Sequence, residues 1–434
     1  MGAVASVKAR LGWKGLKASE YVDDGFIFLS TPNIKGPKID FYSVDHIPAQ
    51  RYYESPEIML QNGDVLIAKD GSTLGIANVV RSLPAPATVN SSIAVIRPVE
   101  KLNSVYCFYF LASHYIQSTI GRMKDGMGVP HLFQADLRKF TVLLPPELEQ
   151  VAIAEFLDRQ TSRIGALIEK KERLITLLEE KRAALITRAV TKGLDPNARL
   201  KDSGILWLGA IPANWETRRL KYLSNFITSG SRGWADHYSD DGAIFLRIGN
   251  LTREGIDLDL SDIQRVQPPP GAEGERTSVN SGDLLVSITA DIGSVAVVPD
   301  NLAPGFVNQH LALVRLRSDL VSPRFVGYAL RAASLQAQFR LALYGGTKQG
   351  LGLDDVANLL VTLPPLSEQA RIVTNIDSAV RRIKAAVSKT REQIAKFQEY
   401  RTALISAAVT GKIDVRGSGA EQAQFDKCSQ IGEH

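Results

Sequence analysis

The chain contains two copies of one sequence pattern, separated by about 219 residues. The copies match at four motifs: DGFIFL and DGAIFL (24–29 and 241–246), GDVL and GDLL (63–66 and 282–285), LPPELEQVAI and LPPLSEQARI (144–153 and 363–372), and RAALI and RTALI (182–186 and 401–405). Self-similarity at a fixed offset indicates repeated structural units. A chain of 434 residues is also longer than one hydrophobic core usually supports. The sequence therefore predicts two similar units.

The first part of each copy, roughly residues 18–144 and 216–363, is rich in Gly, Pro and short runs of β-branched residues. Such runs between turn residues are typical of strands. Helical spacing of apolar residues predicts one helix inside each part, at about 104–120 and 322–343. We therefore expect two mainly β globular domains.

The second part of each copy, roughly residues 147–191 and 366–410, has no Pro and a single Gly. A Pro-Pro pair precedes each part, and proline suits the first turn of a helix because that turn leaves its N–H groups unpaired anyway. Gly193 and Gly411 follow as plausible helix terminators. Each part is thus predicted to form one long helix, which at 1.5 Å per residue spans about 65 Å.

Apolar residues in the two predicted helices alternate at spacings of four and three, as in a coiled-coil seam. The seam residues are Ile164, Ile168, Ile175, Leu178 and Leu185 in the first helix, and Ile383, Val387, Ile394, Phe397 and Leu404 in the second. Both seams are interrupted at equivalent positions, by Lys171 and Thr390 and then by Arg182 and Arg401. These residues either fix the register of the helix pair or lie at its periphery with their polar ends in water.

The order of these motifs resembles the specificity subunits of Type I restriction-modification systems. Each copy has a variable β-rich domain, an LPPxxxQxxI helix start, and a long helix that closes with RxALI and AVT. The segment DSGILWLGAIPANW (202–215) is similar to the lead-in of such a domain, and the resemblance covers about residues 10–416. It implies that each globular domain is a target recognition domain that reads one half of a split DNA site.

The same resemblance implies the partners of the chain. The helices would pair as an antiparallel coiled coil that sets the distance between the half-sites and docks two methyltransferase subunits. Those subunits would methylate adenine with S-adenosylmethionine, a cofactor not expected in this chain. Motor-nuclease subunits would join through the complex and cleave unmodified DNA. The chain itself would be a non-catalytic subunit.

The predicted fold class is α+β, with two mainly β target recognition domains in a pseudo-two-fold repeat separated by two long helices. The predicted boundaries are 1–144 (first recognition domain), 145–193 (central spacer helix), 194–363 (linker and second recognition domain), 364–412 (C-terminal spacer helix) and 413–434 (disordered tail). The lead-in at 202–240 has no complete counterpart before the first domain, because the 219-residue offset would place its first part, 202–219, before residue 1. We therefore expect the first domain to lack its opening strand.

The sequence offers no catalytic motif of the expected kinds. Its Pro-Pro pairs follow Leu144, Leu363 and Gln267, and none follows the Asp, Asn or Ser of an amino-methyltransferase loop. A glycine-rich phosphate-binding motif ending in Gly-Lys-Ser/Thr is absent from the sequence. Six histidines lack the spacing of metal ligands, so no metal site is expected. A self-sufficient nuclease or methyltransferase is the least favoured alternative.

Composition limits the location and the partners. The sequence has no run of about 18 apolar residues that could cross a bilayer. Only Cys107 and Cys428 occur, far apart, which favours a reducing cytoplasm. A net charge of +5 permits a polyanionic partner but does not identify one.

Two pairs of loops are the candidate DNA contacts, because base readout needs polar side chains on exposed loops with Lys or Arg nearby for phosphates. One pair follows the Gly-Asp strand (69–73 and 287–291), and the other precedes the end of the domain (121–128 and 345–350). The candidate residues are Lys69, Ser72, Thr73, Arg122, Lys124, His131, Ser287, Thr289, Thr347, Lys348 and Gln349. Two alternatives remain open: these loops are ordinary solvated turns, or the chain is a non-specific coiled-coil scaffold that holds two binding modules.

Overall fold

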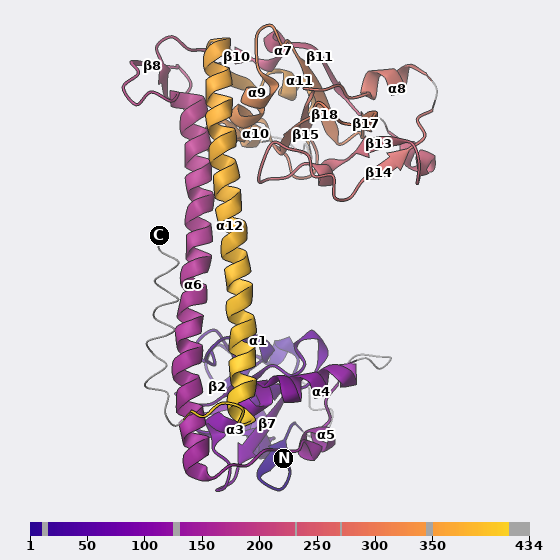
Figure 1. Ribbon diagram of the computed structural model, residues 1–434. Coiled ribbons are helices and arrows are strands. Elements are labelled where there is room, and N and C mark those ends of the chain that lie inside the picture. The colour runs from indigo at the N-terminus through magenta and orange to yellow at the C-terminus, as the bar shows by residue number, and fades with distance from the viewer. Residues whose placement is uncertain (11–15, 125–130, 231, 270, 344–349, 416–434) are drawn as a thin grey trace. The chain divides into compact units, whose positions relative to one another are not determined.

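The computed structural model describes residues 1–10, 16–124, 131–230, 232–269, 271–343 and 350–415. The chain divides into two units, Met1–Glu172 with Thr390–His434, and Arg173–Lys389 (Figure 1). Each unit holds one globular domain and one end of each of two long helices, α6 (Glu147–Lys192) and α12 (Leu366–Val409). No helix among the described residues has the length and apolar character needed to span a membrane.

The first unit contains a four-stranded antiparallel main sheet and a smaller sheet with one parallel pair. In spatial order the main sheet is β1 (Ala5–Lys8), β7 (Ile93–Pro98), β4 (Val65–Ala68) and β5 (Ala77–Val79). The smaller sheet is β3 (Asp45–Ile47), β2 (Phe26–Leu29) and β6 (Ala87–Val89).

The second unit repeats this arrangement. Its main sheet is β11 (Ser224–Ser229), β18 (Leu311–Leu316), β15 (Leu284–Ser287) and β16 (Val295–Val297). Its smaller sheet is β12 (Tyr238–Ser239), β14 (Gln264–Val266), β13 (Ala243–Leu246) and β17 (Gly305–Val307). The parallel pair recurs as β13 with β17, so the sequence repeat is a repeat of the fold.

Shorter elements complete the two units. The short helices are α1 (Thr31–Ile34), α2 (Ala49–Tyr53), α5 (Gln134–Lys139), α7 (Leu220–Leu223), α8 (Ala272–Thr277) and α11 (Leu353–Ala357). Single turns of 3₁₀ helix lie at Ala18–Glu20, Pro56–Ile58, Gly71–Thr73, Trp234–His237 and Ile248–Asn250. Two further strand pairs join β8 (Leu200–Asp202) to β9 (Ala210–Pro212) and β10 (Glu216–Arg219) to β19 (Leu360–Leu363).

The central strand β4 is buried on both faces, which explains its unbroken apolar sequence. Val65 and Ile67 pack into the core beneath the helices, whereas Leu66 packs into the core shared with the smaller sheet. In β15 the corresponding residues Leu284 and Leu285 divide between two cores in the same way. The sheet therefore separates two apolar layers in each unit.

The repeated Gly-Asp motif starts this strand and anchors it. Gly63 has a φ of +91°, in the region where glycine has no steric penalty. The Asp64 carboxylate is buried and accepts two hydrogen bonds from the Arg97 guanidinium, at 2.6 and 2.8 Å. Asp283 and Arg315 form the same pair at 3.0 and 2.8 Å. Both repeats therefore start this strand with the same pair of a buried aspartate and a half-buried arginine.

The prediction of one helix inside each domain was wrong, because the structure has two. The first unit contains α3 (Ser104–Ala112) and α4 (His114–Lys124), and the second contains α9 (Pro323–Arg331) and α10 (Ala333–Leu343). The residue between the helices is extended in both units. The break is stabilised by a glutamine of the second helix: Gln117 donates to the freed Leu111 carbonyl at 2.8 Å, and Gln336 donates to that of Leu330 at 2.6 Å.

The two predicted long helices are present, and the glycines that follow them, Gly193 and Gly411, have φ values of +75° and +70°. The repeated LPPxxxQ motif fastens the start of each helix to its domain. Gln150 is buried, accepts from the Asn103 backbone N–H at 2.8 Å, and donates to the Lys101 carbonyl at 3.0 Å. Its counterpart Gln369 is also buried and makes equivalent bonds.

Gln369→Ala is therefore expected to destabilise the chain, because it leaves the Ser322 N–H and the Pro364 carbonyl without the bonds of 2.8 Å that they now form. Such a loss costs about 1–3 kcal/mol, which corresponds to a fall of several degrees in Tm for a domain of this size. Thermal unfolding of the full chain, followed by circular dichroism, measures it. The matched control is Gln398→Ala, an exposed position on the same helix, where Tm should not change.

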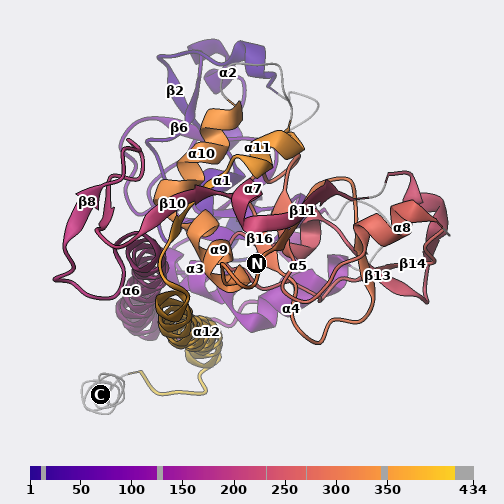
Figure 2. The same ribbon diagram turned by 90° about the horizontal axis from the view of Figure 1, so that it is seen from above.

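The two helices pack against each other inside each unit, where they lie side by side in both views (Figure 1 and Figure 2). In the first unit Ile164 and Ile168 share a core with Phe397 and Leu404. In the second unit Leu185 of α6 packs against the core that contains Ile376 of α12. Each unit pairs the early part of one helix with the late part of the other, so the pair is antiparallel.

All ten predicted seam residues are buried or half-buried. Of the polar residues that interrupt the seam, Thr390 is buried, with 5% of its surface exposed. Lys171, Arg182 and Arg401 are half-buried. The buried threonine fits the role of a register-fixing residue, and the long cationic side chains fit the peripheral one.

The expected loss of the opening strand from the first domain was wrong for its main sheet. β1 pairs with β7 as β11 pairs with β18, so the sheet order is the same in both units. The difference lies instead at the strand pair β10–β19, since residues 141–144, the counterpart of β19, do not form a strand. The lead-in of the second repeat thus adds the strand pair β10–β19, which lies outside the main sheet.

Candidate nucleic-acid interface

In the first unit the predicted loop 69–73 contacts residues 131 and 132, which follow the predicted loop 121–128. Of that second loop, residues 121–124 belong to α4, and residues 125–128 lie outside the described residues. The segment after β4 forms the 3₁₀ turn Gly71–Thr73, and the Leu132 N–H donates to the Lys69 carbonyl at 2.8 Å. The His131 ring Nδ1 and the Asp70 carboxylate form a short polar contact at the same place. Segments about 60 residues apart in the sequence therefore make one surface.

In the second unit the predicted loop 287–291 meets Leu351 in the same way, directly after the predicted loop 345–350, whose residues 345–349 lie outside the described residues. The Leu351 N–H donates to the Ile288 carbonyl at 2.7 Å, and both residues stand at the positions equivalent to the bond in the first unit. Thr289 Oγ1 lies 3.0 Å from the Nδ1 atom of His310. The backbone frame is thus shared by the two units, whereas the polar side chains on it differ.

The described candidate residues differ in their availability to a ligand. Ser72 and Arg122 are exposed, and Thr73 and Thr289 are half-buried. The Arg122 guanidinium donates to Thr119 Oγ1 of its own helix, at 3.3 Å. The Lys69 side chain is 12% exposed, with its ammonium 3.7 Å from the Asp70 carboxylate, so it is less free to bind a phosphate than its sequence position suggests.

The prediction of Ser287 as a DNA contact was wrong. Ser287 is the last residue of β15 and is fully buried, with its hydroxyl donating to the Ala290 carbonyl. Its side chain points inward because both faces of the strand are covered. Thr347, Lys348 and Gln349 lie outside the described residues, as does the side chain of Lys124.

Sequence reasoning missed an ion pair at the end of the candidate loop 287–291. The Arg253 guanidinium contacts the Asp291 carboxylate, which also accepts from Ser294 Oγ at 2.8 Å. Asp291 has a φ of +53°, a strained conformation for a residue other than glycine. The guanidinium beside it lowers the pKa of this carboxyl group. No local motif marks the pair, because its members lie in different loops.

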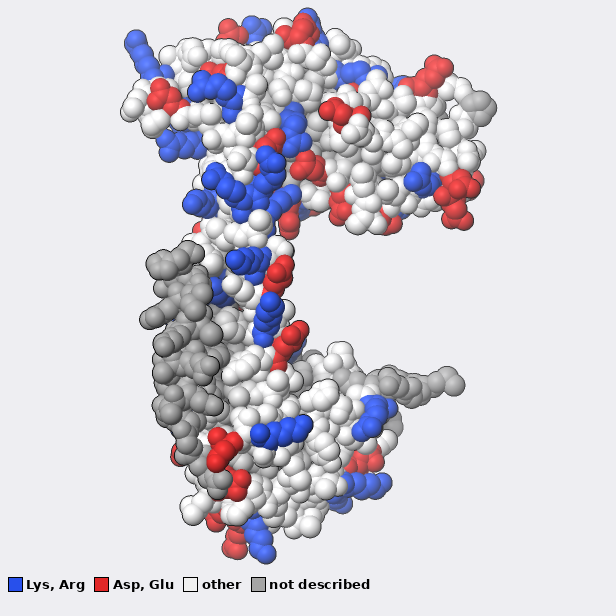
Figure 3. All heavy atoms as spheres, viewed as in Figure 1, with Lys and Arg blue, Asp and Glu red and all other residues white. Residues whose placement is uncertain are grey.

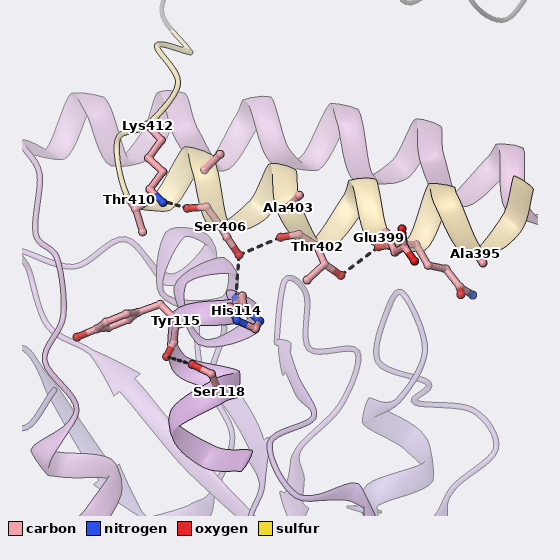
Figure 4. Close-up of a pocket in the computed structure, with 12 residues that line it drawn as sticks. His114, Tyr115, Ser118, Ala395, Glu399, Thr402, Ala403, Ser406, Thr410 and Lys412 are labelled. Atoms are coloured by element: carbon pink, nitrogen blue, oxygen red, sulfur yellow. Dashed lines mark hydrogen bonds between the residues drawn. The ribbon is translucent and has the colours of Figure 1, made fainter. Parts of the chain in front are cut away.

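An open groove of about 1090 Å³ lies in the first unit between α4 and α12 (Figure 4). The backbone N–H of His114 donates to Ser406 Oγ across it at 2.8 Å. In the second unit the N–H of Ala333 donates to Thr187 Oγ1 at 3.1 Å, so this contact also repeats. Among the described residues, no group of His, Cys, Asp or Glu is arranged to hold a metal ion.

Comparisons with known proteins identify the family. The model of the Type I restriction modification DNA specificity domain matches residues 22–177 and 212–395, which is one match for each repeat. The chain is 23% identical over 425 residues to the Type I restriction enzyme EcoBI specificity subunit of Escherichia coli, covering 95% of this chain and 85% of that protein. It is 24% identical over 415 residues to the putative type I restriction enzyme MjaX specificity subunit of Methanocaldococcus jannaschii, covering 93% and 91%.

Solved structures agree on the fold. A chain from a structure of complex assembly and conformational transition of a type I R-M system has a TM-score of 0.70 at 19% identity, covering 88% of this chain and 91% of that chain. The HsdS subunit from Thermoanaerobacter tengcongensis has a TM-score of 0.52 at 19% identity, covering 89% and 91%. Because the family model matches both repeats and most of the sequence, this chain belongs to the family of Type I restriction-modification DNA specificity subunits.

Proposed function

We propose that each globular domain of this chain reads one half of a bipartite DNA site, and that the long helices set the gap between the halves. The observation that carries the proposal is a contact that both units make between the end of the Gly-Asp strand and a segment about 60 residues further along the chain. Both units hold this junction with the same backbone bond, Leu132 to Lys69 and Leu351 to Ile288. A shared frame with different side chains is what two different half-sites require.

The segments joined by this backbone bond carry different hydrogen-bond donors and acceptors in the two units. The first presents Ser72 and Thr73 beside the Asp70–His131 contact, and the second presents Thr289 beside His310. Hydroxyl and imidazole groups hydrogen-bond to base edges, and Arg122 is suited to a phosphate. These groups support a base-reading role for the loops.

The proposal assigns the chemistry to partner subunits. Two methyltransferase subunits would dock on the helix pair and use S-adenosylmethionine, and motor-nuclease subunits would join the same complex. The groove along α12 supports a docking role, because it is lined by small residues such as Ala395, Ala403 and Ala407, over which another helix can pack closely. A subunit that binds the cell's DNA acts in the compartment that holds it, which favours the cytoplasm.

Selection of duplexes from a random library by the chain bound to its methyltransferase subunit tests the proposal. The expected result is enrichment of one motif with two fixed halves and a gap of constant length. Binding that falls with salt equally for every duplex, with no enriched motif, would favour a non-specific scaffold instead. Methyl transfer or cleavage by the purified chain alone would contradict the assignment of the chemistry to its partners.

A further inference from the structure

Four cationic side chains converge on one small cavity of the second unit. Arg182 of α6, Arg253, Arg331 at the end of α9 and Lys384 of α12 line a cavity of about 120 Å³. Arg253 and Arg331 also line a neighbouring cavity of about 390 Å³, together with Arg340. Lys and Arg side chains gather on the surface where the long helices meet this globular domain (Figure 3). We call Arg182, Arg253, Arg331 and Lys384 the basic cluster.

Arg331 is the least compensated member of the basic cluster. It is half-buried, and within the part of the chain that the structure describes its guanidinium has no hydrogen bond or ion pair. Burial and the neighbouring Arg182 lower its pKa, and Asp291 only partly offsets them. A partly desolvated cation close to other cations is unfavourable unless an anion joins them.

The nearby carboxylates do not neutralise the basic cluster. Asp291 contacts Arg253, and Asp257 is hydrogen-bonded to Arg324 at 2.8 Å. Glu254 also lines the cavity, but its side chain is exposed. The carboxylates that line the cavity are Glu254 and Asp257, and Asp257 is already paired with Arg324. The four cations of the cavity therefore leave a surplus of positive charge.

The shared fold does not require the basic cluster. At the 219-residue offset, Arg331, Arg340 and Lys384 correspond to Ala112, Gly121 and Gly165 of the first repeat, and only Arg182 keeps a basic counterpart, Arg401. The first repeat forms the same sheets and helices without these charges. The charges are therefore an addition specific to the second repeat.

We infer that the basic cluster binds a backbone phosphate of the DNA strand whose bases the second repeat reads. The inference rests on the proposed function and names a contact outside the base-reading loops. Its link to those loops is the Arg253–Asp291 contact, since Asp291 ends the candidate loop that contains Thr289. Guanidinium groups match the geometry of phosphate oxygens, and phosphate contacts hold a protein in register on the duplex. An acidic peptide would also meet these charges, but its binding would give no reason for the link to the loop.

The test is Arg331→Ala in the chain bound to its methyltransferase subunit, with DNA affinity measured from about 50 to 200 mM salt. Loss of one phosphate contact should reduce the magnitude of the slope of log affinity against log salt by about 1. Affinity should fall about tenfold for the target duplex and for a scrambled duplex alike. Arg331→Lys should keep the slope, because it keeps the charge. Arg159→Ala, at a position 64% exposed on α6, is the control and should leave the slope unchanged.

Equal Tm values for the wild-type chain and for Arg331→Ala exclude a folding defect. An unchanged slope and affinity would overturn the inference. A lower affinity for the methyltransferase subunit with unchanged DNA affinity would also overturn the inference, and would point to an acidic partner surface. If inorganic phosphate raises Tm only when Arg331 is present but the DNA slope does not change, the site takes a free anion instead of DNA. Failure of the proposed function itself would be seen separately, as a wild-type complex with no sequence preference.

Discussion

Adding four residues to both long helices is expected to abolish methylation of the original target and to create a target with the same two halves and a longer gap. The insertions belong between Glu172 and Arg173 and between Lys389 and Thr390, at the boundary between the units. Four residues lengthen a helix by about 6 Å, which corresponds to one or two base pairs at about 3.4 Å per pair. Long-read sequencing of methylated DNA from cells that express each complex measures the gap.

Two controls separate a change of spacing from damage to the helix pair. Insertion into one helix alone moves its apolar seam residues out of register with those of the other helix. Tm should therefore fall and methylation should be lost. The same four residues placed after Asn197, an exposed turn outside the long helices, should leave the motif intact. If the double insertion methylates the original motif unchanged, the helices do not set the gap.

Removing three exposed or half-buried polar side chains from the candidate surface of the first unit is expected to relax one half of the motif and leave the other half intact. The variant is Ser72→Ala, Thr73→Ala and Arg122→Ala together. Contacts to bases contribute about 1–3 kcal/mol each, so the loss of Ser72 and Thr73 should reduce discrimination against sites altered in that half by about 100-fold. The loss of Arg122, a phosphate contact, should weaken binding to all duplexes alike. The measurement is the rate of methyl transfer to duplexes that vary in one half at a time.

The matched control for this variant is Arg159→Ala, which removes a charge from the same unit away from the loops. Its rates should equal those of the wild-type complex on every duplex. Relaxed discrimination in both halves, or in neither, would show that these three side chains do not read the first half-site.

The features that sequence reasoning predicted correctly depend on local physics or on the repeat itself. A stretch of over 40 residues without proline forms a long helix, and the four-three spacing of Ile164 and Ile168 predicts which of its faces is buried. Glycines at 193 and 411 end the helices because they adopt positive φ angles without cost. The two equal sheets follow from the two equal sequence patterns.

The features that it predicted wrongly, or missed, depend on contacts between distant segments. The break between α3 and α4 relies on Gln117, which satisfies a carbonyl of the preceding helix and that of Gly75 as well. Ser287 is polar and follows a strand motif, yet its burial depends on layers formed by other segments. The basic cluster joins four residues from separate elements, and only the folded chain brings them together.

The central claim is that this chain supplies sequence specificity to an adenine methyltransferase, and the most direct measurement is a map of methylated adenines. The chain is co-expressed with its methyltransferase subunit in a host without adenine methylation, and the genome is read by long-read sequencing. The account predicts methylation at one split motif with a gap of constant length. Methylation without a split motif, or none from a complex that assembles and binds DNA, would contradict it.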